Sequence, residues 1–348
     1  MATRCAAQRR RCGFIACLLV CGLASPGRAR ANTTQEVREP KLRAEMVTDE
    51  TGRRVAVPSE VRRIVSLAPD LTETIYALGA QDRLVGDTSY CDYPPEAQTK
   101  AHVGTPLGPS LEAIVALKPD LILATTAINR RETVAALERL GLSVYATNPH
   151  SVQGSLAGIR RLSDLIGTGA QGEALVARLQ ARLDALHTEL GGRAPRRVLF
   201  VVWEDPLISI GQNTFIDDAL RWAGAESVVR TKQDWPKLGL EEVVRLQPEY
   251  LVFASSHEDS GTSSLSELRA RAAWRDLEAV KQGHVAVISE AIDRPSPRLV
   301  DAIEQLARQL HPDAFAGSSE NKRDARPLEI AEKSYAPSTV NRGFPCTL

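Results

Sequence analysis

The sequence predicts an α/β protein of two Rossmann-like lobes, each built on a mainly parallel sheet, joined by a single long helix. Short apolar runs alternate with amphipathic helical stretches in two separate blocks of the chain. Between these blocks lies a helical region that contains no strand pattern, and a segment of the first block recurs in the second. With 348 residues, the chain is long enough for two lobes of ordinary size.

The first 31 residues have the pattern of an export signal. Four arginines precede an uncharged stretch over residues 12–24, and the small residues Ala29 and Ala31 offer a cleavage site. A stretch this short does not span a membrane, which takes about 20 apolar residues. We expect residues 1–31 to be a signal peptide and the mature protein to be periplasmic. Arg10 and Arg11 leave the twin-arginine route open beside ordinary secretion, and lipoprotein anchoring is less favoured.

The N-terminal lobe is expected at residues 53–168, after a flexible segment at 32–52. Asp70 is the expected cap of its first helix and Gly79 its end. Its expected strands are 54–58, 64–67, 84–86, 121–123 and 144–146, and its expected helices are 70–78, 111–117 and 132–140.

A connecting helix is expected within residues 169–194. From about 172 to 190 it spans roughly 28 Å at about 1.5 Å per residue. Glycines at 191 and 192 end it. The leucines that give it an apolar face are Leu175, Leu179, Leu183, Leu186 and Leu190.

The C-terminal lobe is expected at residues 195–312. Its expected strands are 198–202, 208–210, 251–253 and 285–288, and its expected helices are 215–222, 265–280 and 298–310. Residues 313–348 lose apolar periodicity and are expected to be a disordered tail.

An internal repeat links the two lobes. Residues 110–123 recur 129 positions later as residues 239–252, each copy predicting a short helix, a proline, an acid and a buried strand. Glu112 and Glu241 occupy the same position in the two copies. As first-turn acids they complement the helix dipole, and as a pair they also suit a partner with two-fold symmetry. The repeat alone leaves both interpretations open.

Several motifs resemble the substrate-binding proteins of cobalamin and ferric-siderophore ABC importers. They are the run 63–69 with Thr72 and Glu73, the Tyr-x-Asp-Tyr-Pro-Pro segment that starts at Tyr90, and residues 111–121. Trp235-Pro236 and residues 294–298 continue the resemblance, which covers residues 53–312 and is greatest to the cobalamin-binding branch.

This resemblance implies a monomer that binds its ligand between the lobes. It also implies that Glu112 and Glu241 dock onto arginines of a dimeric permease in the inner membrane. The implied ligand is a corrinoid such as cobalamin, with a ferric siderophore or haem as the alternative, and no resident cofactor is expected.

Candidate ligand contacts come from loops that follow strands. A corrinoid is broad and mostly neutral, so aromatic surfaces and a few hydrogen bonds suit it. Trp203 follows a buried strand, and Trp235 lies in a polar loop. The resemblance adds Tyr90 and a segment after the last strand. That segment consists of Glu290, Ala291, Ile292, Asp293 and Arg294. Residues 106–108, by contrast, lack the tryptophan typical of the cobalamin branch, which weakens that assignment.

Composition and spacing argue against several other functions. Lys plus Arg and Asp plus Glu both total 43, so no net positive charge attracts nucleic acid. The six histidines are scattered without metal-binding spacing, so no metal site is expected. We expect no enzyme. A tetrapyrrole chelatase is the remote alternative, but His102 and His257 have no acidic partner at a fixed spacing. After cleavage only Cys91 and Cys346 remain, which makes a disulfide framework improbable.

Overall fold

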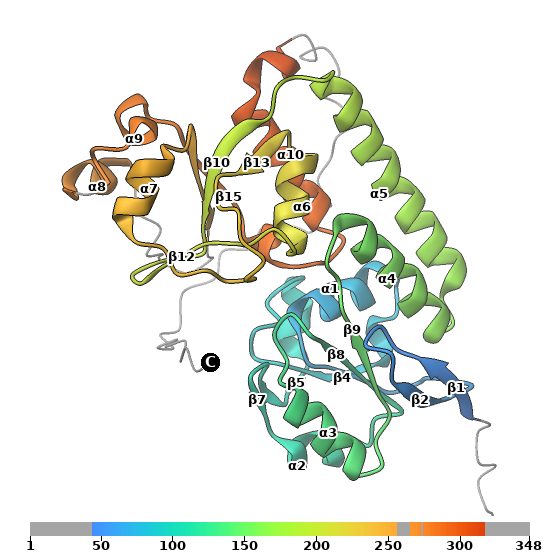
Figure 1. The fold of residues 1–348 in the computed structure, drawn as a ribbon. Helices are drawn as coiled ribbons and strands as arrows, with labels where there is room; N and C mark the ends of the chain where they lie inside the picture. Colours follow the sequence, from blue (N-terminus) through green and yellow to red (C-terminus); the bar gives the residue numbers. More distant parts are fainter. Residues whose placement is uncertain (1–43, 256–264, 273, 317–348) are drawn as a thin grey trace, which may run out of the picture. The chain divides into compact units, whose positions relative to one another are not determined.

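A computed structural model describes residues 44–255, 265–272 and 274–316 (Figure 1). The expected signal peptide and most of the expected tail lie outside these residues.

The N-terminal lobe contains a five-stranded parallel sheet in the order β5-β4-β3-β8-β9. Successive residues of its strands belong to two different buried clusters, one on each face of the sheet. Both faces are therefore covered, as the near-continuous apolar strands predict. The strands are β3 (Ile64–Ser66), β4 (Leu84–Asp87), β5 (Ala101–His102), β8 (Leu121–Thr125) and β9 (Val144–Thr147). The helices are α1 (Pro69–Ala77), α2 (Leu111–Ala116) and α3 (Arg131–Arg139), with 3-10 turns at Gln81–Arg83 and Pro95–Thr99. A small hairpin is formed by β6 (Gly104–Thr105) and β7 (Gly108–Pro109).

The C-terminal lobe contains a four-stranded parallel sheet in the order β13-β10-β14-β15. Figure 1 shows α6 and α10 on one face of this sheet and α7, α8 and α9 on the other. The strands are β10 (Arg196–Val201), β13 (Ala225–Ser227), β14 (Tyr250–Ser255) and β15 (Val285–Ser289), with a hairpin of β11 (Trp203–Glu204) and β12 (Leu207–Ile208). The helices are α6 (Phe215–Trp222), α7 (Leu240–Leu246), α8 (Leu265–Ala270), α9 (Glu278–Gln282) and α10 (Leu299–Leu310), with 3-10 turns at Glu290–Asp293 and Pro312–Phe315.

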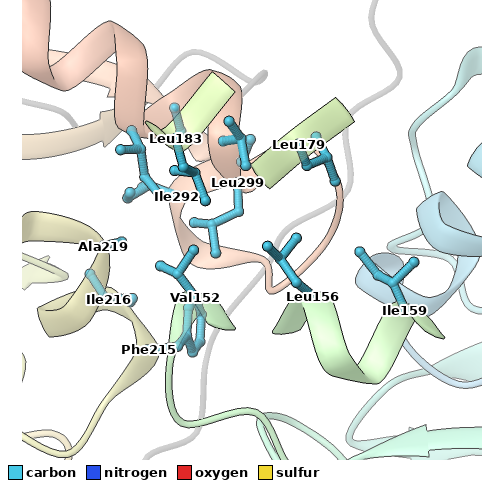
Figure 2. Close-up of a cluster of buried hydrophobic side chains, with 14 of the residues drawn as sticks. Val152, Leu156, Ile159, Leu179, Leu183, Phe215, Ile216, Ala219, Ile292 and Leu299 are labelled. Carbon is cyan, nitrogen blue, oxygen red and sulfur yellow. The ribbon is translucent and has the colours of Figure 1, made fainter. Parts of the chain in front are cut away.

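Two helices connect the lobes along the chain, α4 (Val152–Leu165) and α5 (Gly169–Leu190). All five predicted leucines of α5 are buried. Figure 2 shows Leu179 and Leu183 packed with α4, α6, α10 and Ile292 in one cluster of buried side chains. At about 1.5–3 kcal/mol for each fully buried leucine, this apolar face is a major stabilising contribution. The predicted fold class is confirmed in both lobes and in the long helix.

Three local expectations differ from the structure. Residues 44–48, expected to be irregular, form β1 (Ala44–Thr48), which pairs antiparallel with β2 (Arg54–Pro58). Asp70 is not a helix cap, because Pro69 begins α1 and Ala68 holds the cap position. The helix expected at 265–280 is divided into α8 and α9. Leu268 and Leu277 are both fully buried in one core, and an unbroken helix would place them on opposite sides.

No helix within the described residues combines the length and apolar character needed to cross a membrane.

Gly172 gives a test of the packing between α4 and α5. A Cβ atom at Gly172 would stand 1.9 Å from Ser163 Oγ and 2.3 Å from Ser163 Cβ, so the two helices would have to move apart. We expect Gly172→Ala to lower the free energy of unfolding by about 1–3 kcal/mol, despite alanine's better helix propensity. Chemical denaturation measures this. Gln171→Ala, at an exposed neighbour, should change stability by less than about 0.5 kcal/mol, and equal effects of the two substitutions would contradict the proposed packing constraint.

Candidate functional site

The short helices α2 and α7 belong to equivalent structural modules. Each helix is followed by a non-glycine residue with a left-handed backbone directly before a proline, Lys118 with φ 46° and Gln247 with φ 44°. These positions lie 129 residues apart, as the sequence repeat requires. The repeat is therefore structural and extends to an uncommon backbone conformation.

An arginine at the start of a central strand in each lobe closes the same module: Arg63 directly precedes β3, and Arg197 is the second residue of β10. Arg63 Nη2 donates to the Leu117 carbonyl at 2.7 Å, and Arg197 Nη2 donates to the Leu246 carbonyl at 2.7 Å. Both carbonyls lie at helix C-termini, where a cation is favourable. The sequence repeat did not identify these arginines, because their spacing is not 129 residues.

Glu112 and Glu241 are both exposed at the start of these helices, but their surroundings differ. Ser110 caps α2 by accepting from the Ala113 N–H, and its hydroxyl lies 3.1 Å from Glu112 Oε2. Hydrogen bonds from the Glu112 N–H and from Ser110 lower the pKa of Glu112. Gly239, the equivalent of Ser110, has no side chain to cap α7.

The Tyr90 segment follows β4 and is fastened by Cys91. The Cys91 side chain is 1% exposed and lies within hydrogen-bond distance of the Thr72 and Thr88 hydroxyls, at 3.2 and 3.3 Å. Tyr90 and Asp92 flank this anchor and are both partly exposed. Because Cys91 between them is held by Thr72 and Thr88, the backbone that carries Tyr90 and Asp92 is fixed at this point.

The segment after β15 combines core residues with polar ones. Ser289 accepts from the Ala291 N–H and begins the 3-10 turn. Ala291 and Ile292 are 1% and 0% exposed, and Figure 2 shows Ile292 among the buried aliphatic side chains. These two predicted contact residues therefore belong to the buried core. Asp293 is exposed, and Glu290 is partly buried.

Arg294 joins this segment to the N-terminal lobe. Its Nη1 donates to Glu73 Oε1 and to Asp92 Oδ1, both at 2.8 Å, and its Nη2 donates to Asp92 Oδ2 at 3.3 Å. Two predicted ligand segments, one from each lobe, thus meet through Arg294. Planar guanidinium groups suit such multiple carboxylate contacts.

Arg298 and Ser296 extend this network. Arg298 donates to Glu73 Oε1 at 3.3 Å and to Glu290 Oε1 at 3.2 Å. Its guanidinium carbon lies 3.8 Å from the centre of the Tyr93 ring, a cation–π contact. Ser296 donates to Glu73 Oε2 at 2.6 Å.

The two tryptophans form a second group within the C-terminal lobe. Trp203 in β11 pairs with Ile208, and Ile208 bridges to Lys237 in the loop that carries Trp235. Both tryptophans are 45% exposed. Two exposed aromatic side chains in neighbouring segments suit contact with the flat face of a ligand.

His102 has an acidic partner that the sequence analysis missed. Its Nδ1 lies 2.8 Å from Asp87 Oδ1, because β4 and β5 align Asp87 opposite His102. Burial raises the pKa of Asp87 to about 6, although the nearby His102 opposes this shift. Only the pairing of two short strands reveals this contact.

Metal and cavity features give no further site. Within the described residues, no group of three or more His, Cys, Asp or Glu side chains could hold a metal ion. A cavity of about 530 Å³ lies beside β1, β2 and the end of α4, and Val47, Tyr145 and Arg161 are among its lining residues. None of the predicted ligand residues lines this cavity.

Two α/β lobes, each with a parallel sheet and joined by one long helix, are the architecture of a two-lobed solute-binding protein. The sequence profile of the periplasmic binding protein family matches residues 64–291, and the chain belongs to this family. A vitamin B12-binding protein of Vibrio cholerae serotype O1 is 30% identical over 259 residues, covering 74% of this chain and 91% of the relative.

Solved structures agree with this assignment. The periplasmic vitamin B12 binding protein BtuF of Vibrio cholerae is 28% identical with a TM-score of 0.64, covering 74% of this chain and 98% of that one. The periplasmic heme-binding protein RhuT from Roseiflexus sp. RS-1, in apo form, is 26% identical with a TM-score of 0.65, covering 73% and 99%. The family resemblance inferred from the sequence is confirmed.

Asp70, a buried residue of α1, makes the stability of the folded protein dependent on pH. Burial and the nearby Glu73 charge raise the pKa of Asp70 from 3.8 to about 7. Because the folded state keeps this proton more tightly, the contribution of Asp70 to stability is largest below pH 4 and is lost as the pH rises to 7. We expect Asp70→Asn to raise Tm by about 3 °C or more at pH 8 and to leave it unchanged at pH 4. Thermal unfolding from pH 4 to 8 tests this. Asp82→Asn, at an exposed site, is the control, and an equal response of both variants would contradict the prediction.

Proposed function

We propose that this chain is the periplasmic substrate-binding component of an ABC importer and that it captures a corrinoid such as cobalamin. The observation that carries the proposal is the junction of the Tyr90 segment with the 290–298 segment, one from each lobe, through Arg294 and Asp92. The relatives named as vitamin B12-binding proteins support the choice of ligand. Trp203 and Trp235 offer exposed aromatic surface for the corrin face.

Haem or a ferric siderophore is the second candidate ligand. Residues 106–108 stand where the cobalamin branch typically has a tryptophan, and the Pro106 carbonyl accepts from Asn129 Nδ2 at 3.0 Å. One side of a corrinoid pocket would therefore lack an aromatic wall. The likeness to a haem-binding structure supports the same alternative.

Delivery is proposed to use Glu112 and Glu241 as docking groups for a dimeric permease in the inner membrane. Equivalent modules present the two glutamates, and each glutamate has an exposed valine three residues later, Val115 and Val244. Residues three apart share a helix face, so each lobe offers one carboxylate beside one apolar side chain. A partner with two-fold symmetry suits this duplicated pattern.

The proposed molecule is a monomeric binding protein in the periplasm, exported by its signal peptide. No catalytic role is proposed, since the relatives are named as binding proteins.

Ligand titration tests the capture function. We expect purified protein to bind cyanocobalamin with quenching of tryptophan fluorescence, confirmed by calorimetry because corrinoids absorb light. Trp235→Ala should weaken binding by about tenfold or more, since it removes a stacking contact that the bound ligand would bury. Trp222→Phe, at a partly buried tryptophan packed beside His187, should bind normally. Binding of haem or a ferric siderophore without cyanocobalamin would replace the corrinoid assignment.

Charge reversal tests the docking function. Glu112→Lys combined with Glu241→Lys should abolish uptake in cells that carry the cognate permease, because a cation would then meet a cation. Ligand affinity of the purified double variant should stay within about twofold of the unchanged protein. Glu132→Lys with Glu278→Lys, two first-turn acids of other helices, is the matched control. Normal uptake by the Glu112/Glu241 variant would remove these residues from the docking role.

A further inference from the structure

The junction between the lobes is built around one buried carboxylate. The Glu73 side chain is 2% exposed, and those of Arg294 and Arg298 are 16% and 17% exposed. Glu73 Oε1 accepts from both arginines, and Glu73 Oε2 accepts from Ser296. A charge this deeply buried persists only when it is paired and hydrogen-bonded, and these three donors supply that pairing.

The groups around Glu73 come from both predicted ligand segments. Arg294 also binds Asp92, two residues after Tyr90. Arg298 also binds Glu290 and lies over Tyr93. Glu73 belongs to neither segment, because it lies within α1, yet it contacts both arginines that hold the segments together.

This arrangement changes the role of Arg294. Its guanidinium donates three hydrogen bonds to carboxylates of the N-terminal lobe, so these donors are used within the protein. The arginine therefore fixes the distance between the two segments, and neighbouring side chains are left to contact a ligand.

We propose that Glu73 is a positioning residue of the ligand site: it holds Arg294 and Arg298 and thereby sets the placement of the Tyr90 segment against the 290–298 segment. Only the ligand-affinity part of this inference rests on the proposed binding function.

Glu73→Gln tests the inference because it removes the charge and keeps the size. Arg294 and Arg298 would lose their shared counter-charge, and Ser296 would face an amide in place of a carboxylate oxygen. We expect faster hydrogen–deuterium exchange in residues 90–97 and 289–299 of the ligand-free protein. We also expect cyanocobalamin affinity to fall by about tenfold at a temperature well below Tm.

Glu304→Gln is the matched control. Glu304 pairs with Arg182 of α5 at 2.9 Å, and its side chain is 20% exposed. This substitution also removes one carboxylate from an arginine pair, but the pair lies outside both segments. It should leave exchange in the two segments and ligand affinity unchanged, even where Tm falls.

Each outcome decides the inference. Unchanged exchange in Glu73→Gln would overturn it, and so would faster exchange with normal cyanocobalamin affinity. If Glu73→Gln does not fold, Ser296→Ala takes its place. It removes the 2.6 Å hydrogen bond to Glu73 and the 3.2 Å bond that the Ser296 hydroxyl accepts from the Arg298 N–H, and it leaves the Glu73 carboxylate with both arginines. We expect exchange changes in the same two segments and an affinity loss of about threefold. If the unchanged protein does not bind cyanocobalamin, the ligand proposal fails, and the exchange experiment alone decides the role of Glu73.

Discussion

The buried aliphatic face of α5 is the constraint on which the rest of the structure depends. It packs against α4 on one side and against α6 and α10 on the other, so one continuous core includes residues of both lobes. Gly172 permits the close approach of α4, and the Arg182 pairs with Asp301 and Glu304 add polar contacts to α10. Ile292 lies in the same core (Figure 2). Two residues later, Arg294 binds Glu73 and Asp92 of the N-terminal lobe.

Much of the fold was accessible from the sequence because the strands are buried on both faces. Runs such as 121–123 and 251–253 are apolar without alternation, as parallel central strands must be. The leucines of α5 gave its buried face directly. The sequence did not predict that residues 265–280 form two helices, because the local sequence favours one helix. The reason for the break is tertiary: Leu268 and Leu277 are both buried in the same core. Strand β1 was missed since its residues are mostly exposed and, among the strands that the structure describes, it pairs with β2 alone.

The candidate site shows a similar division. The sequence repeat and the family resemblance predicted Glu112, Glu241, Tyr90 and the 290–294 segment as candidate contacts. They did not show that Ala291 and Ile292 are core residues, or that Arg294 meets Glu73, a residue 221 positions earlier in the chain. His102 and Asp87 likewise become partners only through strand pairing. Contacts of this kind depend on tertiary structure, and a single sequence contains no periodicity that indicates them.

The burial of Cys91 has a chemical consequence. Its thiol is 1% exposed, and burial raises its pKa to about 12, so it stays protonated at neutral pH. Thiolate is the reactive form of cysteine. Alkylating reagents and oxidants therefore reach this sulfur only when the first lobe opens, and the rate of its modification reports that opening. Under oxidising conditions the same burial keeps this free thiol out of mixed disulfides.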